Sequence, residues 1–181
     1  MKRVAIIGAV LALAAGCSHP TTMSEAKQQA YARWHHTRAE LLVNSARQHY
    51  EDGQLDAAQQ QLEQALRFQD DHVAARLLLA RVYIEQGSYV PAGAQLQWVQ
   101  SHQGPSPETL YLLGVTLERQ GRLDEALEPY KQAFALDRTD AAPMLAATEV
   151  LVTLGRVREA STYLESYLAV AGEDVSAYEL A

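Results

Sequence analysis

The sequence predicts an all-α solenoid, in which antiparallel helix pairs stack along the chain. The first observation is a fixed spacing: four glycines each follow the previous one by 34 residues. A constant period of this length is typical of proteins built from one repeated helix–turn–helix unit. The second observation is that small and large residues recur at the same places between these glycines. The four glycines are Gly53, Gly87, Gly121 and Gly155.

Side-chain size follows the same period. With each glycine at position 15, the repeats begin at residues 39, 73, 107 and 141. Small residues at positions 8 and 20 let two antiparallel helices approach closely, and large residues at position 24 fill the space between repeats. Position 8 holds Ala46, Ala80, Gly114 and Thr148; position 20 holds Ala58, Ala92, Ala126 and Ala160; position 24 holds Leu62, Leu96, Tyr130 and Leu164.

Together these positions resemble the tetratricopeptide repeat (TPR) family. The resemblance covers residues 39–172 and implies a right-handed TPR-type α-solenoid with repeats at 39–72, 73–106, 107–140 and 141–174. Residues 175–181 would start a fifth repeat or form a capping helix. The fourth repeat departs from the pattern at Thr148 and Tyr167, and the family's usual proline near position 32 is absent. The third repeat fits best, with Leu113, Gly114, Gly121, Ala126, Tyr130 and Ala133.

Glycine and proline predict the helix boundaries. Each repeated glycine should end the first helix of its repeat, because glycine adopts a left-handed backbone at low cost. Pro91 is expected in the first turn of a helix, where no intrahelical hydrogen bond is lost. Pro129 is expected inside a helix, which it should kink or shift.

Residues 23–38 are expected to form a helical extension before the first repeat. Thr22 and Glu25 have the spacing of a capping box, so the helix should start here and run toward Gly53. Its apolar side would cover the end of the first repeat, with partner binding as the alternative. That side consists of Met23, Ala26, Ala30, Tyr31 and Trp34.

The N-terminus has the pattern of an export signal. Two basic residues precede an apolar run over residues 4–15, which is too short to span a bilayer as a helix. Small residues then lead to Cys17, which resembles a bacterial lipobox. This resemblance implies removal of residues 1–16 and lipidation of Cys17, the first residue of a linker over 17–22. The alternative is an ordinary secretory signal cleaved at residues 12–14.

Charge and cysteine content narrow the classes of partner. The chain carries 15 Lys and Arg against 22 Asp and Glu, a net charge of −7, and loss of the two basic residues within 1–16 makes it −9. An acidic surface is a poor nucleic-acid binder. Nor should it adhere to anionic lipid, so membrane attachment would depend on the covalent anchor. Cys17 is the only cysteine, which excludes an internal disulfide and a thiolate metal site.

The sequence offers no candidate catalytic, cofactor or metal site. His35 and His36 point about 100° apart on a helix and cannot chelate one ion together. Residues Asp70, Asp71 and His72 are interpreted as a loop that ends in a helix cap. There is no phosphate-binding glycine loop and no nucleophile beside a base. We therefore expect a protein without enzyme activity, cofactor or metal.

The TPR resemblance implies a groove lined by the first helices, with positions 2, 5, 9, 12 and 13 facing it. Position 5 makes its floor apolar, and position 9 places two arginines toward its N-terminal half, where a guanidinium suits a carboxylate or peptide carbonyls. Alternatively, these arginines pair with Glu51 and Glu85. The family's two-carboxylate clamp is matched only in part, by Asn44. The expected groove residues are Val43, Arg47, Leu77, Arg81, Tyr111, Val115, Leu145 and Glu149.

Two functions fit these features. The first is a lipid-anchored scaffold that binds a protein or peptide at the bacterial cell envelope, as in pilus assembly, secretion or outer-membrane biogenesis. The alternative is an accessory or regulatory subunit that recruits an envelope enzyme such as a cell-wall hydrolase. By resemblance, Ser18 favours the outer membrane, facing the periplasm. We also expect further repeats in a longer chain, or self-association through an exposed patch of Leu151, Leu154, Leu164, Tyr167 and Leu168.

Overall fold

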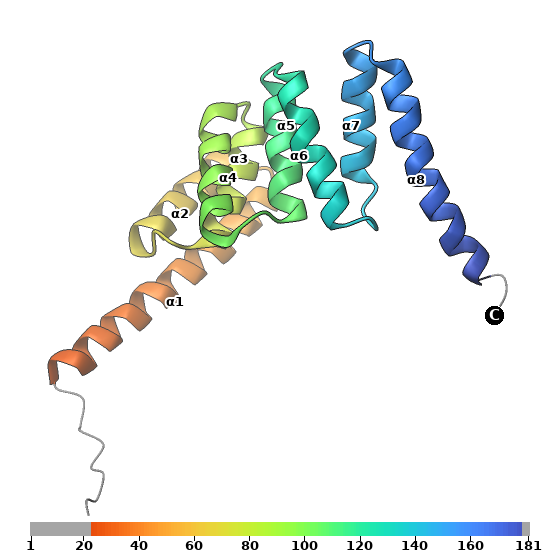
Figure 1. Ribbon diagram of the computed structural model, residues 1–181. Coiled ribbons are helices and arrows are strands. Elements are labelled where there is room, and N and C mark those ends of the chain that lie inside the picture. Colours follow the sequence, from red (N-terminus) through yellow and green to blue (C-terminus); the bar gives the residue numbers. More distant parts are fainter. Residues whose placement is uncertain (1–22, 179–181) are drawn as a thin grey trace, which may run out of the picture. The chain divides into compact units, whose positions relative to one another are not determined.

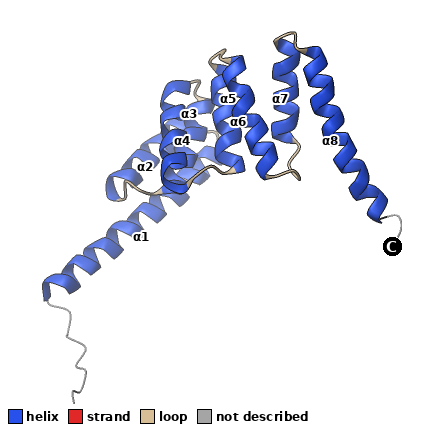
Figure 2. Cartoon of the chain, viewed as in Figure 1, coloured by secondary structure: helices blue, strands red, loops and turns tan. Residues whose placement is uncertain are grey.

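The computed structural model describes residues 23–178, without the side chains of Met23 and residues 169–178. The predicted signal peptide, Cys17, the linker and Thr22 lie outside the described residues. Those described are helices and short loops, with no strand among them (Figures 1 and 2). The chain divides into two units inside α1, between Trp34 and His35. The helices are α1 (Met23–Glu51), α2 (Leu55–Phe68), α3 (Val73–Glu85), α4 (Tyr89–Gln103), α5 (Pro107–Arg119), α6 (Leu123–Leu136), α7 (Ala142–Thr153) and α8 (Val157–Tyr178).

The repeated glycines form the turn inside each helix pair, as predicted. All four have a positive φ, between 73° and 76°. At Gly121 the glycine N–H donates to Glu118 O at 2.8 Å, and the next N–H, of Arg122, donates to Leu117 O at 3.0 Å. This pair of hydrogen bonds is a Schellman motif, which satisfies carbonyls left open at the end of α5. The same pattern recurs at the other three glycines, so the sequence period is a period of helix ends.

The small positions bring the two helices of each pair together. The residues at positions 8 and 20 are buried in the first three repeats. In the third repeat a Cβ added to Gly114 would lie 2.5 Å from two atoms of the Tyr130 ring, so a tyrosine at position 24 requires glycine at position 8. The Tyr130 hydroxyl donates to Glu118 Oε2 at 2.7 Å. Burial, and then this hydrogen bond to a carboxylate, raise the pKa of the Tyr130 phenol.

The loop before α3 ends in a helix cap, which confirms that part of the prediction. His72 is buried, and its Nδ1 accepts a hydrogen bond from the Ala75 N–H at 3.3 Å. Its Nε2 lies 3.2 Å from Glu40 Oε1, close enough for an ion pair but without hydrogen-bond geometry. His72 therefore joins α1 to the start of α3.

α1 runs without a break across residue 38 to Glu51, in agreement with the predicted helix that runs toward Gly53, so the extension and the first helix of the first repeat are one helix. α8 continues without a break past Val175 to Tyr178. Gly172 lies inside α8. The prolines lie as expected, with Pro91 in the first turn of α4 and Pro129 inside α6.

The expected exposed patch of the fourth repeat is only partly present. Leu151 is fully buried in a cluster with Ala147 and Ala160, because α8 packs over α7. Leu168 is 57% exposed, and the other three members of the patch are half-buried. Among residues 23–178, no helix has the length and apolar character needed to cross a membrane.

Candidate functional site

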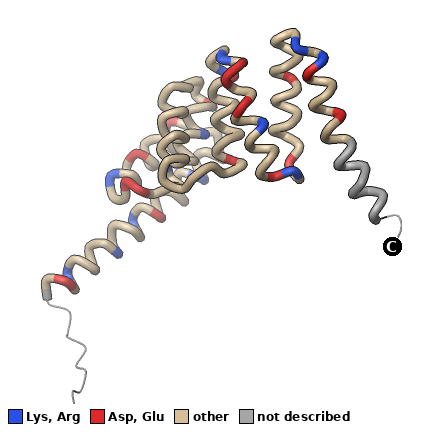
Figure 3. The backbone as a smooth tube through the Cα atoms, viewed as in Figure 1, with Lys and Arg blue, Asp and Glu red and all other residues tan. Residues whose placement is uncertain are grey.

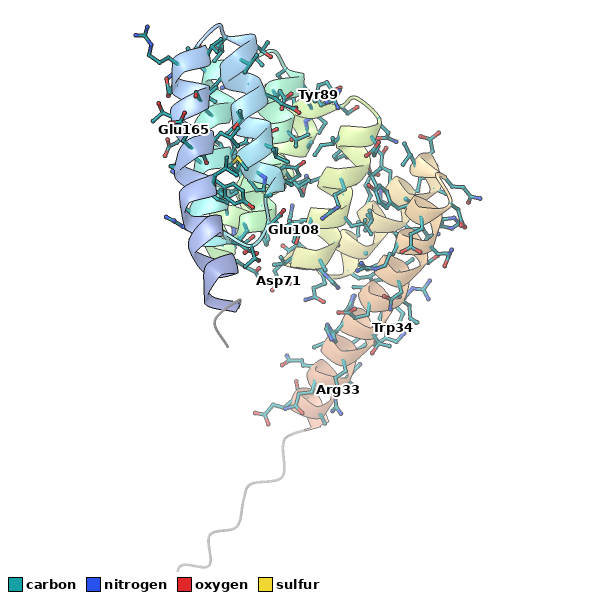
Figure 4. All side chains as sticks on the ribbon, turned by 90° about the vertical axis from the view of Figure 1, so that its right-hand side faces the viewer. Arg33, Trp34, Asp71, Tyr89, Glu108 and Glu165 are labelled. Carbon is teal, nitrogen blue, oxygen red and sulfur yellow. The ribbon has the colours of Figure 1, made fainter. Side chains whose placement is uncertain are left out.

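A hollow with a volume of about 410 Å³ lies between the first helices of the first three repeats, α1, α3 and α5. We call it the Arg47 hollow. Glu108 reaches it from the first turn of α5 (Figure 4). All of its lining residues belong to the unit that begins at His35. They are Arg47, Tyr50 and Glu51 from α1, Ala74, Leu77, Leu78 and Arg81 from α3, and Glu108 from α5.

The lining residues occupy the repeat positions that the TPR resemblance assigns to the groove, with the single exception of Leu78 at position 6. This agreement follows from the common register of the repeats, which presents the same face of each first helix. Three of the predicted groove residues line the hollow: Arg47, Leu77 and Arg81. The other five lining residues were not chosen from the sequence. Leu78 had no signal at position 6, whereas positions 2, 12 and 13 were the available signal for Tyr50, Glu51, Ala74 and Glu108.

The two arginines of the hollow have different environments. Arg81 Nη2 lies 2.8 Å from Glu108 Oε1, an ion pair between neighbouring repeats. The alternative that the arginines pair inside the array therefore holds for Arg81, but its partner is Glu108 and not Glu85. Arg47 is exposed and has no ion pair or hydrogen bond with another side chain in the described part of the chain, not even with Glu51, one helical turn away. Figure 3 shows the basic and acidic positions along these helices. The hollow thus offers one uncommitted guanidinium.

The floor of the hollow is apolar. Leu78 is 6% exposed, while Leu77 and Tyr50 are half-buried and pack against buried core residues. An apolar floor below a free guanidinium can hold a segment that carries both an apolar side chain and a carboxylate. A planar guanidinium can donate two parallel hydrogen bonds to that carboxylate.

The remaining predicted groove residues do not share one environment. Val43 is only 2% exposed, in the core cluster that it shares with Leu78 and Leu79 of α3, so its assignment to the groove is wrong. Tyr111 and Val115 are half-buried against the core of the third and fourth repeats. Glu149 is exposed, and Leu145 is 51% exposed. Arg47, Leu77 and Arg81 therefore remain the predicted residues that the structure brings together.

The two adjacent histidines considered as metal ligands from the sequence, His35 and His36, lie outside the Arg47 hollow. His36 Nδ1 lies 3.0 Å from Gln69 Oε1, and the His35 ring lies 5.5 Å from the Phe68 ring. The two histidines thus contact different residues of the segment that ends α2. Within residues 23–178, no group of three or more His, Cys, Asp or Glu side chains is placed to hold a metal ion.

Comparisons with known proteins agree with this geometry. A family model described as tetratricopeptide repeat matches residues 49–114 and 117–181. MamA 41-end from Desulfovibrio magneticus RS-1 is similar with a TM-score of 0.70 and 16% identity, over 83% of this chain and 82% of that one. MamA AMB-1 gives a TM-score of 0.64 and 21% identity, over 82% and 87% of the two chains.

A third similar structure was solved with a peptide. It is the first TPR of Spaghetti (RPAP3) bound to the HSP90 peptide SRMEEVD, with a TM-score of 0.63 and 12% identity, over 66% of this chain and 95% of that one. At these identities the solved structures establish the fold. No curated protein matches the sequence. The family match extends over more than half of the residues and over the repeats seen in the structure, and this chain belongs to the tetratricopeptide repeat family.

Proposed function

We propose that this TPR scaffold is a lipid-anchored protein of the bacterial cell envelope, and that it holds a protein or peptide partner in the Arg47 hollow. The observation that carries the binding site is the exposed Arg47 guanidinium, without an ion pair among the described residues, above the apolar floor of Leu77 and Leu78. A similar fold was solved with a peptide bound, which supports a peptide as the kind of ligand.

The charges of the hollow restrict the peptide that it would hold. Arg47 provides one cationic contact, whereas Arg81 is already paired with Glu108. Residues 39–181 carry 10 Lys and Arg against 21 Asp and Glu, a net charge of −11, so a strongly acidic partner would be repelled at long range. A segment with one carboxylate beside apolar residues therefore fits better than an acidic tail.

The anchor is supported by the sequence alone. The basic start, the apolar run over residues 4–15 and the small residues before Cys17 make one consistent export and lipidation signal. The measurement is the intact mass of the protein extracted from membranes. An acylated Cys17 at the N-terminus is the expected result, and an N-terminus at Ala15 would contradict it. Replacement of Cys17 by Ser should release the protein from the membrane without unfolding the repeats.

The binding site is tested best by reversing the charge of Arg47. Arg47→Glu leaves the Arg81–Glu108 ion pair in place, whereas Arg81→Glu would set two carboxylates against each other. Arg67→Glu is the matched control, because Arg67 is also exposed but lies on α2, outside the hollow. Proteins cross-linked to each variant in membranes are then identified by mass spectrometry.

The expected result is a partner captured by the parent and by Arg67→Glu and lost from Arg47→Glu, with unchanged helical signal in all three. Loss in Arg47→Glu alone would assign the partner to the hollow. Equal capture by Arg47→Glu would refute the site and move the interface to another surface of the repeats. Loss together with lower helicity would instead assign Arg47 a role in stability.

A further inference from the structure

The unit that ends at Trp34 carries an exposed aromatic and basic face. Tyr31 is 57% exposed and Trp34 is 52% exposed. Together with Lys27 and Ala30 they line a shallow hollow, and the Lys27 ammonium lies 6.0 Å from the centre of the Tyr31 ring. In Figure 4 the side chain of Trp34 projects from this part of α1. We call these four residues the Trp34 face.

The helix register separates this face from the acidic residue of the segment. Residues 27, 30, 31 and 34 have the spacing of one side of an α-helix. Glu25 and Trp34 are nine residues apart, so at about 100° per residue they lie on opposite sides of the helix. Arg33, also exposed and labelled in Figure 4, lies about 60° around the helix from Ala30, on the flank of this face, and its Nε donates to the Gln29 carbonyl oxygen at 3.3 Å. The Trp34 face thus combines two aromatic rings with the Lys27 ammonium and contains no carboxylate.

The charge of this segment is opposite to that of the rest of the chain. Residues 23–38 carry three Lys and Arg against one Glu, a net charge of +2, whereas residues 39–181 have a net charge of −11. The general expectation that an acidic protein avoids anionic lipid therefore does not apply to this segment. Basic residues close to an anionic bilayer are attracted to it over about one Debye length.

The position of the segment in the sequence selects a membrane as its occupant. Only residues 18–22 lie between Cys17 and the start of α1, and a fully extended chain from Cys17 to Met23 spans about 20 Å. If Cys17 is acylated, as in the proposed function on which this inference rests, α1 begins within that distance of the bilayer surface. Trp and Tyr rings favour this interfacial region because each has an apolar body and a polar edge.

We propose that the Trp34 face lies in the headgroup region of an anionic phospholipid bilayer, as a second, non-covalent contact beside the anchor. The aromatic rings of Tyr31 and Trp34 enter the boundary between headgroups and acyl chains. The Lys27 side chain extends from the face toward lipid phosphates, and the Arg33 guanidinium reaches them from the flank with its terminal nitrogens, as long basic side chains do at membrane interfaces.

The test measures quenching of Trp34 by lipid. The full chain, purified with its attached lipid, is reconstituted into vesicles of phosphatidylethanolamine and brominated phosphatidylglycerol. Trp34→Phe is compared with the parent, so that the difference reports Trp34 and the remaining Trp98 serves as an internal reference. The expected result is strong quenching in the parent and little quenching in Trp34→Phe. Quenching of the parent should be weaker in vesicles made only of zwitterionic lipid, in which brominated phosphatidylcholine supplies the quencher.

A charge-matched pair tests the electrostatic part. Lys27→Glu/Arg33→Glu should reduce the quenching of Trp34 several-fold. Arg67→Glu/Arg158→Glu makes the same change in net charge at exposed positions of α2 and α8, and it should leave the quenching as in the parent. Equal effects of the two pairs would overturn the proposed contact, because net charge alone would then explain the result.

The remaining outcomes separate this inference from the proposed function. If the protein stays with the vesicles while Trp34 remains unquenched, the anchor is retained and the inference is overturned. Protein that does not stay with vesicles at all overturns the anchor, and the inference with it. Cross-links between two copies through position 31, in place of quenching, would show that a second protein molecule covers the Trp34 face, which also overturns the inference.

Discussion

Gly114→Ala provides the sharpest test of how the repeats pack. A Cβ at this position would lie 2.5 Å from the Tyr130 ring, about 1 Å closer than an ordinary contact. The ring is fully buried and its hydroxyl is bonded to Glu118, so it has little freedom to move. Overpacking of this kind costs about 1–3 kcal/mol, whereas alanine gains about 1 kcal/mol over glycine in helix propensity. We expect a net destabilisation of about 0–2 kcal/mol.

The other repeats show how the clash should be relieved. The first two repeats combine alanine at position 8 with leucine at position 24, as Ala46 with Leu62 and as Ala80 with Leu96, all four fully or nearly fully buried. In a Tyr130→Leu background, Gly114→Ala should therefore stabilise the protein by about 0.5–1 kcal/mol through helix propensity. The double-mutant cycle should give a coupling of about 1–3 kcal/mol, the overpacking cost that leucine at position 24 removes.

The assay is guanidinium unfolding followed by circular dichroism for all four members of the cycle. Gly93→Ala is the control, because Gly93 also lies inside a helix, α4. A Cβ added there would meet only Thr116 Cγ2, at an ordinary contact distance of 3.7 Å. This variant should be as stable as the parent or slightly more stable. The reasoning is refuted if Gly114→Ala is no less stable than Gly93→Ala, or if the coupling between Gly114 and Tyr130 is near zero.

Three further predictions follow from single contacts. His72→Ala should cost about 1 kcal/mol because the Ala75 N–H loses its cap, and His72→Asn should recover most of this in thermal melts. Gly121→Ala should cost about 1 kcal/mol because alanine is strained at φ 76°, and equal stability would contradict this explanation. The raised pKa of Tyr130 means that the folded state keeps a proton which the unfolded chain releases above about pH 10, so the free energy of unfolding should fall as the pH rises past that value. Tyr130→Phe should lessen this fall in unfolding curves measured at pH 9 to 11, and an identical fall would show that the buried Tyr130 phenol does not contribute to it.

The sequence by itself determined the fold and its register. The turn at Gly121 and the contact of Gly114 with Tyr130 are both made within one 34-residue repeat. Interactions within one repeat restrict the residue type at fixed positions, and the restriction can be recognised because it recurs in every repeat. For the same reason repeat positions 2, 5, 9, 12 and 13 identified the face of the first helices that lines the Arg47 hollow.

Only the tertiary structure decided how neighbouring repeats complete that face. Position 5 is buried at Val43, which shares its core with α3, but it is exposed at Leu145, because the described residues contain no fifth repeat to cover it. Arg81 pairs with Glu108 of the next repeat and not with its helical neighbour Glu85. Such contacts depend on the offset and rotation between successive repeats, which residue spacing within one repeat does not specify.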